Sequence, residues 1–435
     1  MNGRMFLAPT RVVVFLHRHG AKRNLRVASL NRVTNTIDSS RLQGAKLSLP
    51  MIRSNRRSSF LPSSSVVHSP PNSLSFPRFS PQRRSVSSSF PIIPPPATFN
   101  DVDRDPRNIS LQDAIEETRR ITQQLFPDVR SLFSCLSPNL RELASYYFDG
   151  SGKAIRPQFV LLMACSVNQH QHGVSGQLTL AQKQVAMIAE MIHTASLLHD
   201  DVIDQADKRR GKRSANERWG QREAILAGDY VLGLASKVLA EIGDTAIVTM
   251  ISQILMDLVQ GEFMQMGSKQ EENDRFTHYL DKTYKKTASL LANCFKAVAH
   301  LASANSSVQE AAFEVGRNLG IAFQLIDDLL DFEVSSEMLG KPVVADLRLG
   351  LATAPVLFAC RDHPEMESMI MRRFSSPSDV AEAYRLVLAS NGLHETRVLA
   401  QSYADAAHRH LSAIRKTPYR LALGHMLDSM LKRRR

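Results

Sequence analysis

The chain has 435 residues, of which 54 are basic and 42 acidic, and its formal net charge is +12. Residues 1–100 carry 15 of the basic side chains and one acidic side chain, a net charge of +14, so the remaining residues are nearly neutral at −2. Because the excess positive charge is confined to the leader, the composition excludes a chain that binds nucleic acid along its whole length. The four cysteines contain no C-x-x-C pair, so neither a zinc site nor a disulfide framework is indicated.

The first 107 residues have the composition of a targeting segment followed by a linker. The leader is rich in arginine and serine and nearly free of acidic residues, which is typical of a transit peptide, and Val12–Leu16 is too short an apolar core for a secretory signal. The Pro- and Ser-rich stretch from Leu61 to Phe99 cannot bury a core. We expect residues 1–107 to be a mitochondrial transit peptide and disordered linker, with a generic basic tail as the alternative.

No stretch approaches about 18 uninterrupted apolar residues, so the sequence predicts at most peripheral contact with a membrane. Together with the leader, this predicts a mature protein in the mitochondrial matrix or on the matrix face of the inner membrane.

Helical periodicity dominates from residue 108 to residue 435. Ser110, with Asp113 three residues later, has the pattern of a helix cap. Apolar residues then recur at i, i+3 and i+4 without a convincing alternating strand pattern. The clearest such segments are Val185–His199, Ala224–Ile242, Ala246–Met266 and Ala311–Asp331. Residues 108–435 are therefore predicted to form one all-α domain, a helical bundle around a deep central cavity.

Two copies of the carboxylate pattern D-D-x-x-D stand far apart in this helical region. They are Asp200–Asp204 and Asp327–Asp331, and each follows an apolar run. Positions i and i+4 share a helix face, so the first and last aspartates of each copy point the same way. Mg²⁺ binds one or two carboxylates and leaves its other positions to water and phosphates. A single copy is also found on acidic helix faces that are exposed to solvent. Two copies that face one cavity instead predict a site in which a diphosphate is held between two metal-binding walls.

Four basic clusters accompany the two acidic motifs. They are Gly152–Pro157, Lys208–Lys212, Lys286–Thr287 and Gly340–Pro342. The planar fork of arginine binds phosphate oxygens bidentately and lysine adds a point charge, whereas exposed ion pairs alone contribute little. Separate cationic clusters beside two carboxylate walls are what a site for two diphosphate substrates requires.

These motifs belong to an ordered set of blocks that resembles the trans-type polyprenyl diphosphate synthases. The resemblance extends from about Leu111 to the C-terminus. Its blocks are His193–Asp201, Leu226–Tyr230, Gly320–Gln324 and Asp346–Pro355. Ser145–Gly150 and Met371–Ser375 are most similar to the animal members, which make the ubiquinone side chain with a second, related subunit.

The resemblance implies a Mg²⁺-dependent enzyme that joins isopentenyl diphosphate to an allylic diphosphate, either farnesyl or geranylgeranyl diphosphate. Loss of the allylic diphosphate gives a stabilised carbocation, the double bond of isopentenyl diphosphate attacks it, and a proton is lost. Metal and fixed cations would stabilise the departing diphosphate. The residues that match the catalytic aspartates are Asp200, Asp201, Asp204, Asp327, Asp328 and Asp331, with Asp200, Asp204 and Asp327 as metal ligands.

The family match also implies the residues that bind the two substrates. Arg209 falls on the side of the allylic diphosphate. The residues on the isopentenyl side are Lys153, Arg156, His193 and Arg210. The residues at further phosphate-binding positions or beside the second motif are Lys286, Thr287, Gln324 and Lys341.

Small side chains upstream of the first motif predict a long product. Position 195 lies roughly 7.5 Å deeper than Asp200 along a helix, and Ala195 and Ser196 are too small to close a tunnel there. The family match points to nine or ten isoprene units. Two alternatives remain, a shorter-chain geranylgeranyl diphosphate synthase and a non-catalytic subunit of a synthase complex. The non-catalytic subunit would be expected to have lost aspartates, and all six are present.

The leader generates the first testable prediction. We expect the protein recovered from mitochondria to begin between about residue 30 and residue 100, because import removes an acid-poor transit peptide. N-terminal sequencing of the organelle form measures this directly. An intact Met1 in that form, or protein confined to the cytosol, would contradict the transit peptide.

Overall fold

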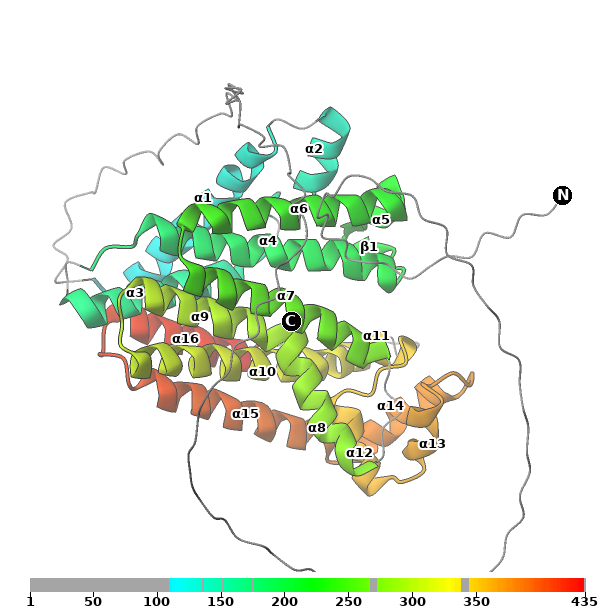
Figure 1. Ribbon diagram of the computed structural model, residues 1–435. Helices are drawn as coiled ribbons and strands as arrows, with labels where there is room; N and C mark the ends of the chain where they lie inside the picture. The colour runs from blue at the N-terminus through cyan, green and yellow to red at the C-terminus, as the bar shows by residue number, and fades with distance from the viewer. Residues whose placement is uncertain are drawn as a thin grey trace, which may run out of the picture. The chain divides into compact units, whose positions relative to one another are not determined.

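The computed structural model describes residues 109–134, 137–150, 152–173, 176–266, 272–337 and 344–433, which are helical almost throughout (Figure 1). The predicted transit peptide and linker lie outside these residues, so the boundary at residue 108 stays a prediction. The all-α fold is confirmed. The helices are α1 (Leu111–Leu132), α2 (Pro138–Ser145), α3 (Ile155–His172), α4 (Leu180–Ile203), α5 (Ala215–Trp219), α6 (Gln221–Ile242), α7 (Thr245–Met266), α8 (Glu272–Thr283), α9 (Ser289–Leu301), α10 (Ser306–Glu337), α11 (Ala345–Arg348), α12 (Ala354–Asp362), α13 (Met366–Met371), α14 (Asp379–Ala389), α15 (Gly392–Leu411) and α16 (Pro418–Leu431).

Local sequence explains where the first helices begin. Ser110 Oγ accepts a hydrogen bond from the backbone N–H of Asp113 at 3.1 Å, and the Asp113 carboxylate accepts one from the Ser110 N–H at 3.1 Å. This capping box starts α1 and confirms the predicted cap. Thr179 and Gln182 form the same box at the start of α4. The four segments with the clearest helical periodicity lie within α4, α6, α7 and α10.

The helices pack around an extended apolar core. Helix α10 lies against α9 and α15, α4 lies against α6, and α3 contacts α4, α9 and α16 (Figure 1). Many of the largest fully buried side chains come from α3 and α4, including Phe159, Met163 and Ile188. Each such side chain stabilises the fold by about 1.5–3 kcal/mol relative to an exposed one. The core therefore fixes α4 and α10, the helices that carry the two aspartate motifs.

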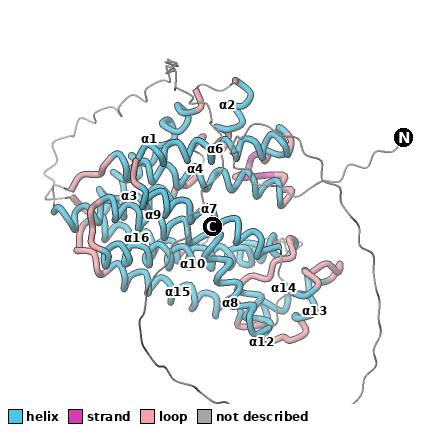
Figure 2. Tube along the Cα trace, viewed as in Figure 1, coloured by secondary structure: helices cyan, strands magenta, loops and turns pink. Residues whose placement is uncertain are grey.

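Two elements were not predicted from the sequence. Strands β1 (Lys208–Arg209) and β2 (Lys212–Arg213) form a short antiparallel hairpin, shown in magenta in Figure 2. Arg210 and Gly211 form its turn with φ of +52° and +77°, the backbone of a two-residue hairpin turn. A π-helix, η2 (Tyr284–Ala288), joins α8 to α9, and such irregular turns are frequent at functional sites. Both elements carry basic residues that were predicted to bind phosphate.

Helix α10 approaches η2 and α9 closely because it has glycine at the contacts. A Cβ atom placed on Gly320 would lie 2.4 Å from the Cα of Ala288, and one on Gly316 would lie 2.6 Å from the carbonyl oxygen of Leu291. Real Cβ atoms do not approach other atoms this closely. Gly320 therefore sets how closely α10 approaches η2, and Gly316 sets how closely it approaches α9.

We predict that Gly320→Ala destabilises the fold by about 1–3 kcal/mol, the usual effect of inserting a methyl group into a packed interior. Gly233→Ala on α6 is the matched control, because a Cβ there meets no atom within 4 Å and alanine favours a helix by up to about 1 kcal/mol. Urea unfolding of the two variants measures the difference. Equal stability of Gly320→Ala and Gly233→Ala would show that α10 does not depend on this contact.

Candidate active site

The first aspartate motif lies in the last turn of α4, and its members have different surroundings. Burial raises the pKa of Asp200 to about 6, and Lys286 opposes that rise. Burial likewise raises the pKa of Asp204, which caps the helix. Asp201 is fully buried instead, where its carboxylate accepts from the Tyr147 hydroxyl at 2.8 Å and from Arg209 at 2.5 and 2.7 Å. Asp200 and Asp204 thus share a face, as predicted, while Asp201 anchors the helix from behind.

The second motif, on α10, shows the same difference between a buried middle aspartate and two less buried outer ones. Asp328 is buried and accepts hydrogen bonds from the Tyr279 hydroxyl at 2.5 Å and from Gln324 Nε2 at 2.9 Å. Asp327 accepts from Arg433 Nη2 at 3.0 Å, and Asp331 accepts from the first N–H groups around α11. Burial raises the pKa of all three carboxyl groups. In both motifs the middle aspartate is held by a buried tyrosine, so we propose that Asp201 and Asp328 position the outer aspartates.

Asp346 shows that the two motifs approach each other. Burial raises its pKa to about 8, and the negative charges of Asp328, Asp331 and Asp204 add to the rise. Asp204 belongs to the first motif and the other two belong to the second. The structure therefore brings aspartates of both motifs near Asp346, and we call these carboxylates the acidic cluster; Lys282 offsets part of their negative charge.

This cluster fits divalent cations that are shared with a substrate. Carboxylates taken out of water are stabilised by nearby positive charge. Among the described residues, no three His, Cys, Asp or Glu side chains gather closely enough to form a preformed metal cage. Mg²⁺ takes only one or two carboxylates and completes its shell with water and phosphate. We propose that Asp200 and Asp204 on one wall and Asp327 and Asp331 on the other hold such ions.

A separate group of basic side chains lies between α3, α4 and the β1–β2 hairpin. Arg156 Nη1 lies 3.1 Å from His193 Nε2, and the Arg156 guanidinium lies 5.4 Å from the ring of Phe323. Burial, reinforced by Arg156 and Arg210, lowers the pKa of His193 well below its usual range. Neutral His193 therefore accepts a hydrogen bond from Arg156. Lys153 lies in the segment that precedes α3, so four of the residues predicted for the isopentenyl side come from neighbouring elements.

The remaining predicted residues line the wall between α7, η2 and α10. Lys286 pairs with Glu262 at 2.5 Å and with Gln265 at 3.1 Å. Thr287 Oγ1 donates to Gln324 at 2.9 Å, and Gln324 in turn donates to Asp328. This hydrogen-bonded row connects η2 to the second motif. Lys341 lies outside the described residues.

The two positions predicted to set product length have different environments. Ala195 is fully buried in the main core. Ser196 is partly exposed, and its hydroxyl donates to the His193 carbonyl at 2.9 Å. Ser196 lies four residues before Asp200 and so shares its helix face, whereas Ala195 is turned toward the packing of the bundle. Their role in product length stays a prediction.

Four residues of the site were missed by reasoning from the sequence. Tyr147 and Tyr279 hold the middle aspartates, Asp346 completes the acidic cluster, and Arg433 contacts Asp327. Arg433 also lies 5.7 Å from the ring of Phe323, and its buried Nε has no hydrogen-bond partner among the described residues. Tyr147 and Asp346 stand in the family blocks Ser145–Gly150 and Asp346–Pro355, but the blocks gave neither residue a role. Tyr279 and Arg433 had no motif around them that could have identified them.

Known proteins resemble this chain in sequence and in fold. The model of the polyprenyl synthetase family matches residues 137–387. The chain belongs to this family. It is 52% identical over 309 residues to the human all trans-polyprenyl-diphosphate synthase PDSS1, covering 71% of this chain and 74% of that protein. It is 38% identical over 338 residues to the decaprenyl-diphosphate synthase subunit 1 of Schizosaccharomyces pombe, covering 72% of this chain and 89% of that protein.

A solved structure supports the same placement. The polyprenyl synthase from Caulobacter crescentus, complexed with calcium and isoprenyl diphosphate, matches with a TM-score of 0.66 and 30% identity, covering 75% of this chain and 98% of that one. The chain is therefore a prenyltransferase of the polyprenyl diphosphate synthase class.

The acidic cluster of this synthase generates a metal-binding prediction. At about 100 times the Kd, Mg²⁺ with inorganic diphosphate should stabilise the folded chain by about 2.7 kcal/mol, which raises the unfolding temperature of a helical domain of about 330 residues by roughly 4 °C. Asp200→Asn/Asp204→Asn should lose most of this shift, whereas Asp405→Asn, an exposed position on α15, should keep it. Differential scanning calorimetry measures all three proteins.

The stabilisation by Mg²⁺ and diphosphate should increase with pH. In the absence of metal, the raised pKa values of Asp200, about 6, and Asp346, about 8, mean that these groups favour the folded state at low pH. Their contribution is lost as the pH rises through those values. The stabilisation by Mg²⁺ should therefore grow between about pH 5 and pH 8. A shift that is independent of pH and of Asp200 would contradict the metal assignment.

Proposed function

We infer that this synthase adds isopentenyl diphosphate units to a farnesyl or geranylgeranyl diphosphate primer, with Mg²⁺ as its cofactor. The proposed product has nine or ten isoprene units and serves as the side chain of ubiquinone. The names of the human and fission-yeast relatives support long-chain synthesis, and the calcium and isoprenyl diphosphate of the bacterial structure support a metal-dependent diphosphate site. The acid-poor leader supports a mitochondrial location, in the matrix or on the matrix face of the inner membrane.

The residues of this chain form two subsites, one for the allylic diphosphate and one for isopentenyl diphosphate. In each cycle the bond between the allylic carbon and the diphosphate oxygen breaks, and diphosphate leaves with the electron pair. The isopentenyl double bond forms the new carbon–carbon bond, and the proton then lost passes to the departing diphosphate. Bound metal would neutralise the charge of this leaving group. Arg156 and Arg210 would hold isopentenyl diphosphate, while neutral His193 fixes the direction of the Arg156 guanidinium.

The observation that carries this proposal is the pairing of the acidic cluster with a separate cluster of guanidinium groups. The acidic cluster needs metal to bind a diphosphate, whereas the guanidinium cluster does not. Two diphosphates can therefore bind side by side by different means, which a condensation of two diphosphate substrates requires. A non-catalytic subunit has no use for both clusters.

We also propose that the chain works with a second, related subunit that docks on α7. Four large apolar side chains recur along one exposed face of this helix, namely Met256, Val259, Phe263 and Met266. Leu255 and Leu258 of the same helix pack against the core instead.

Helix α7 is also the one described helix that is long and apolar enough to cross a membrane by length and composition. Its Asp257 hydrogen-bonds to Ser289 and its Glu262 pairs with Lys286, so α7 is tied into the bundle and its exposed face favours a protein partner. Full activity of this chain alone, as a stable homodimer in light scattering, would contradict the second subunit.

The length of the product tests the proposed function. The wild-type complex should incorporate labelled isopentenyl diphosphate into products of nine or ten units. Ser196→Phe should shift the product toward three or four units without abolishing incorporation, because an aromatic ring on the Asp200 face closes the tunnel beside the first motif; Ala195→Phe tests the deeper position that the sequence predicted. Ala195 is fully buried, so circular dichroism must show that its variant is folded.

Chromatography of the dephosphorylated products gives the answer. If both variants make the wild-type product, the tunnel runs elsewhere. If the wild type itself stops at four units, the shorter-chain alternative is correct.

A further inference from the structure

Glu190 is a buried carboxylate on α4, the helix that ends in the first aspartate motif. Its side chain is 5% exposed, and it lies three residues before His193, so the two side chains share a helix face. Among the described residues, Glu190 has no hydrogen bond or ion pair. A buried carboxylate without a bonding partner is costly, and the sequence gave this one no role.

The charges that act on Glu190 belong to the guanidinium cluster, Arg156 and Arg210. Arg156 Nη1 lies 3.1 Å from His193 Nε2. A Cβ atom placed on Gly152 would lie 2.7 Å from Arg210 Nη1, so the β1–β2 hairpin holds Arg210 against the segment that precedes α3. Two guanidinium groups therefore approach the Glu190 side of α4 from two other elements.

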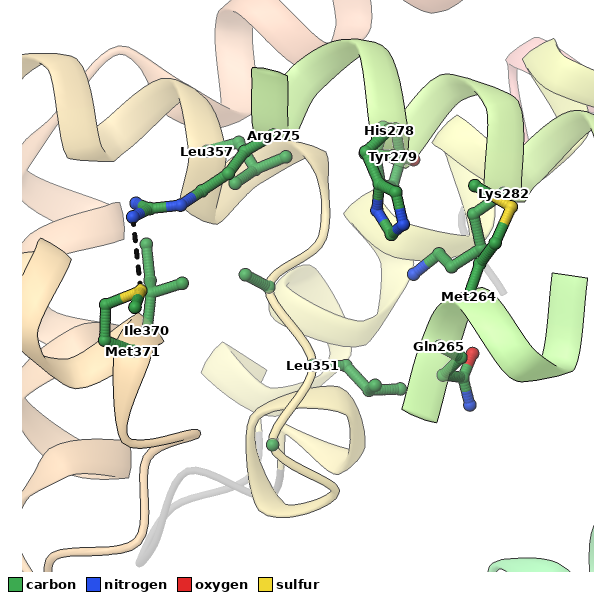
Figure 3. A pocket seen from close by; sticks show the side chains of 12 residues that line it. Met264, Gln265, Arg275, His278, Tyr279, Lys282, Leu351, Leu357, Ile370 and Met371 are labelled. Carbon is green, nitrogen blue, oxygen red and sulfur yellow. Dashed lines mark hydrogen bonds between the residues drawn. The ribbon is translucent and has the colours of Figure 1, made fainter. Parts of the chain in front are cut away.

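Basic side chains near the second motif have closer acidic neighbours. In the pocket between α8 and α12, shown in Figure 3, Arg275 pairs with Glu367 at 2.5 Å. Lys282 in the same pocket lies near the negative charges of Asp328 and Asp346. The positive charge at that end of the site is thus already offset by carboxylates.

The guanidinium cluster, by contrast, has no ion pair among the described residues. Burial lowers the pKa of Arg156, Glu190 and then Asp327 oppose this shift, and Arg210 adds to it. Asp327 is bonded to Arg433 and is a proposed metal ligand. Glu190 is therefore the carboxylate that remains to balance this cluster.

The same interaction determines the charge of Glu190. Burial raises the pKa of Glu190 to about 6, and the positive charges of Arg156 and Arg210 oppose this rise. Among the described residues, no charged group of α1, α5, α6 or α9, the other helices that pack against α4, acts on it. His193 on its own helix is neutral, because burial and the arginines lower its pKa. Glu190 is thus mostly ionised at pH 7, with the guanidinium cluster as its stabilising charge.

A diphosphate bound to the guanidinium cluster removes this stabilisation. Its negative charges pair with the guanidinium groups and repel the Glu190 carboxylate. A charge roughly 7 Å from a carboxyl group changes its protonation equilibrium more than tenfold when the effective dielectric constant is about 20. A tenfold change is enough to protonate about half of a carboxyl group whose pKa is one below the pH.

We propose that Glu190 is a positioning residue of the isopentenyl subsite, which balances the guanidinium cluster in the free protein and takes up a proton from the solvent when isopentenyl diphosphate binds. The proposal rests on the proposed function, which places that diphosphate on Arg156 and Arg210. Protonated Glu190 leaves both guanidinium groups to the substrate. The same diphosphate stays on the lengthened chain and must leave the subsite in every cycle, and ionised Glu190 favours its departure.

Proton uptake can be measured directly. Isothermal titration calorimetry of the full chain, with its partner subunit where one is needed, should use isopentenyl diphosphate in EDTA at pH 7, in buffers that differ in ionisation enthalpy. The wild type should take up at least about 0.4 proton more per bound ligand than Glu190→Gln. Its affinity relative to that of Glu190→Gln should also fall about fivefold between pH 6 and pH 8, because the ionised carboxylate opposes the diphosphate. The ionisation of the ligand itself is common to both proteins.

Matched variants complete the test. Glu310→Gln is the control, because Glu310 is exposed on α10 and pairs with Lys296 at 2.9 Å, and it should take up protons as the wild type does. Glu190→Asp, which restores a carboxylate, should keep most of the extra uptake. A merely structural role would lower the unfolding temperature without changing the proton number.

A second measurement needs no variant. Infrared difference spectra of the wild type should show the carbonyl band of one protonated carboxyl group appearing when isopentenyl diphosphate binds. This test stands even where thermal unfolding shows that Glu190→Gln is not folded.

Two results would overturn the role of Glu190. One is an equal proton number for the wild type and folded Glu190→Gln, and the other is the absence of the carbonyl band. Failure of the proposed function would look different, since isopentenyl diphosphate would then bind equally well to the wild type and to Arg156→Met/Arg210→Met, or would not bind at all.

Discussion

Two buried hydrogen bonds, from Tyr147 to Asp201 and from Tyr279 to Asp328, hold together a site that electrostatics alone would drive apart. Each motif places three carboxylates within five residues, and the two motifs meet at Asp346. Like charges in a desolvated setting repel, and an isolated buried carboxylate would take up a proton instead of binding metal. A hydrogen bond to a charged group contributes about 1.5–3 kcal/mol, so the tyrosines fix each helix by its middle aspartate. The outer aspartates are left partly exposed.

The rest of the bundle sets the positions of α4 and α10, the two helices that these hydrogen bonds hold. Gly316 and Gly320 let α10 lie against α9 and η2, and η2 presents Lys286 and Thr287 to the motifs. The β1–β2 hairpin turns Arg209 back onto Asp201 and brings Arg210 toward Tyr147. Positive charge therefore reaches the site from two elements that interrupt the regular helices. Arg209, Arg210 and Lys286 thus come from irregular segments, whereas Arg156 comes from α3 and the two aspartate motifs from α4 and α10.

The sequence correctly predicted the features that depend on regular spacing along a single helix. The helices α4, α6, α7 and α10 follow from their apolar periodicity, and the shared face of Asp200 and Asp204 follows from their spacing. Contacts between distant segments could not be predicted in this way, because no periodicity connects them. Tyr147 and Asp201 are 54 residues apart, Tyr279 and Asp328 are 49 apart, and Arg433 and Asp327 are 106 apart. The sequence distinguished Asp200, Asp204 and Asp327 as metal ligands, but it could not show that Asp201 and Asp328 are buried against tyrosines.

The central claim is that the outer aspartates of the two motifs hold metal over a single diphosphate. Anomalous diffraction from crystals grown with Mn²⁺ and inorganic diphosphate tests it most directly, because the peaks locate the metal without any assumption about activity. The account predicts metal peaks beside Asp200 and Asp204 and beside Asp327 or Asp331, bridged by one diphosphate, with Asp201 and Asp328 still bonded to their tyrosines. Metal bound to Asp201 or Asp328, with Tyr147 or Tyr279 displaced, would contradict it.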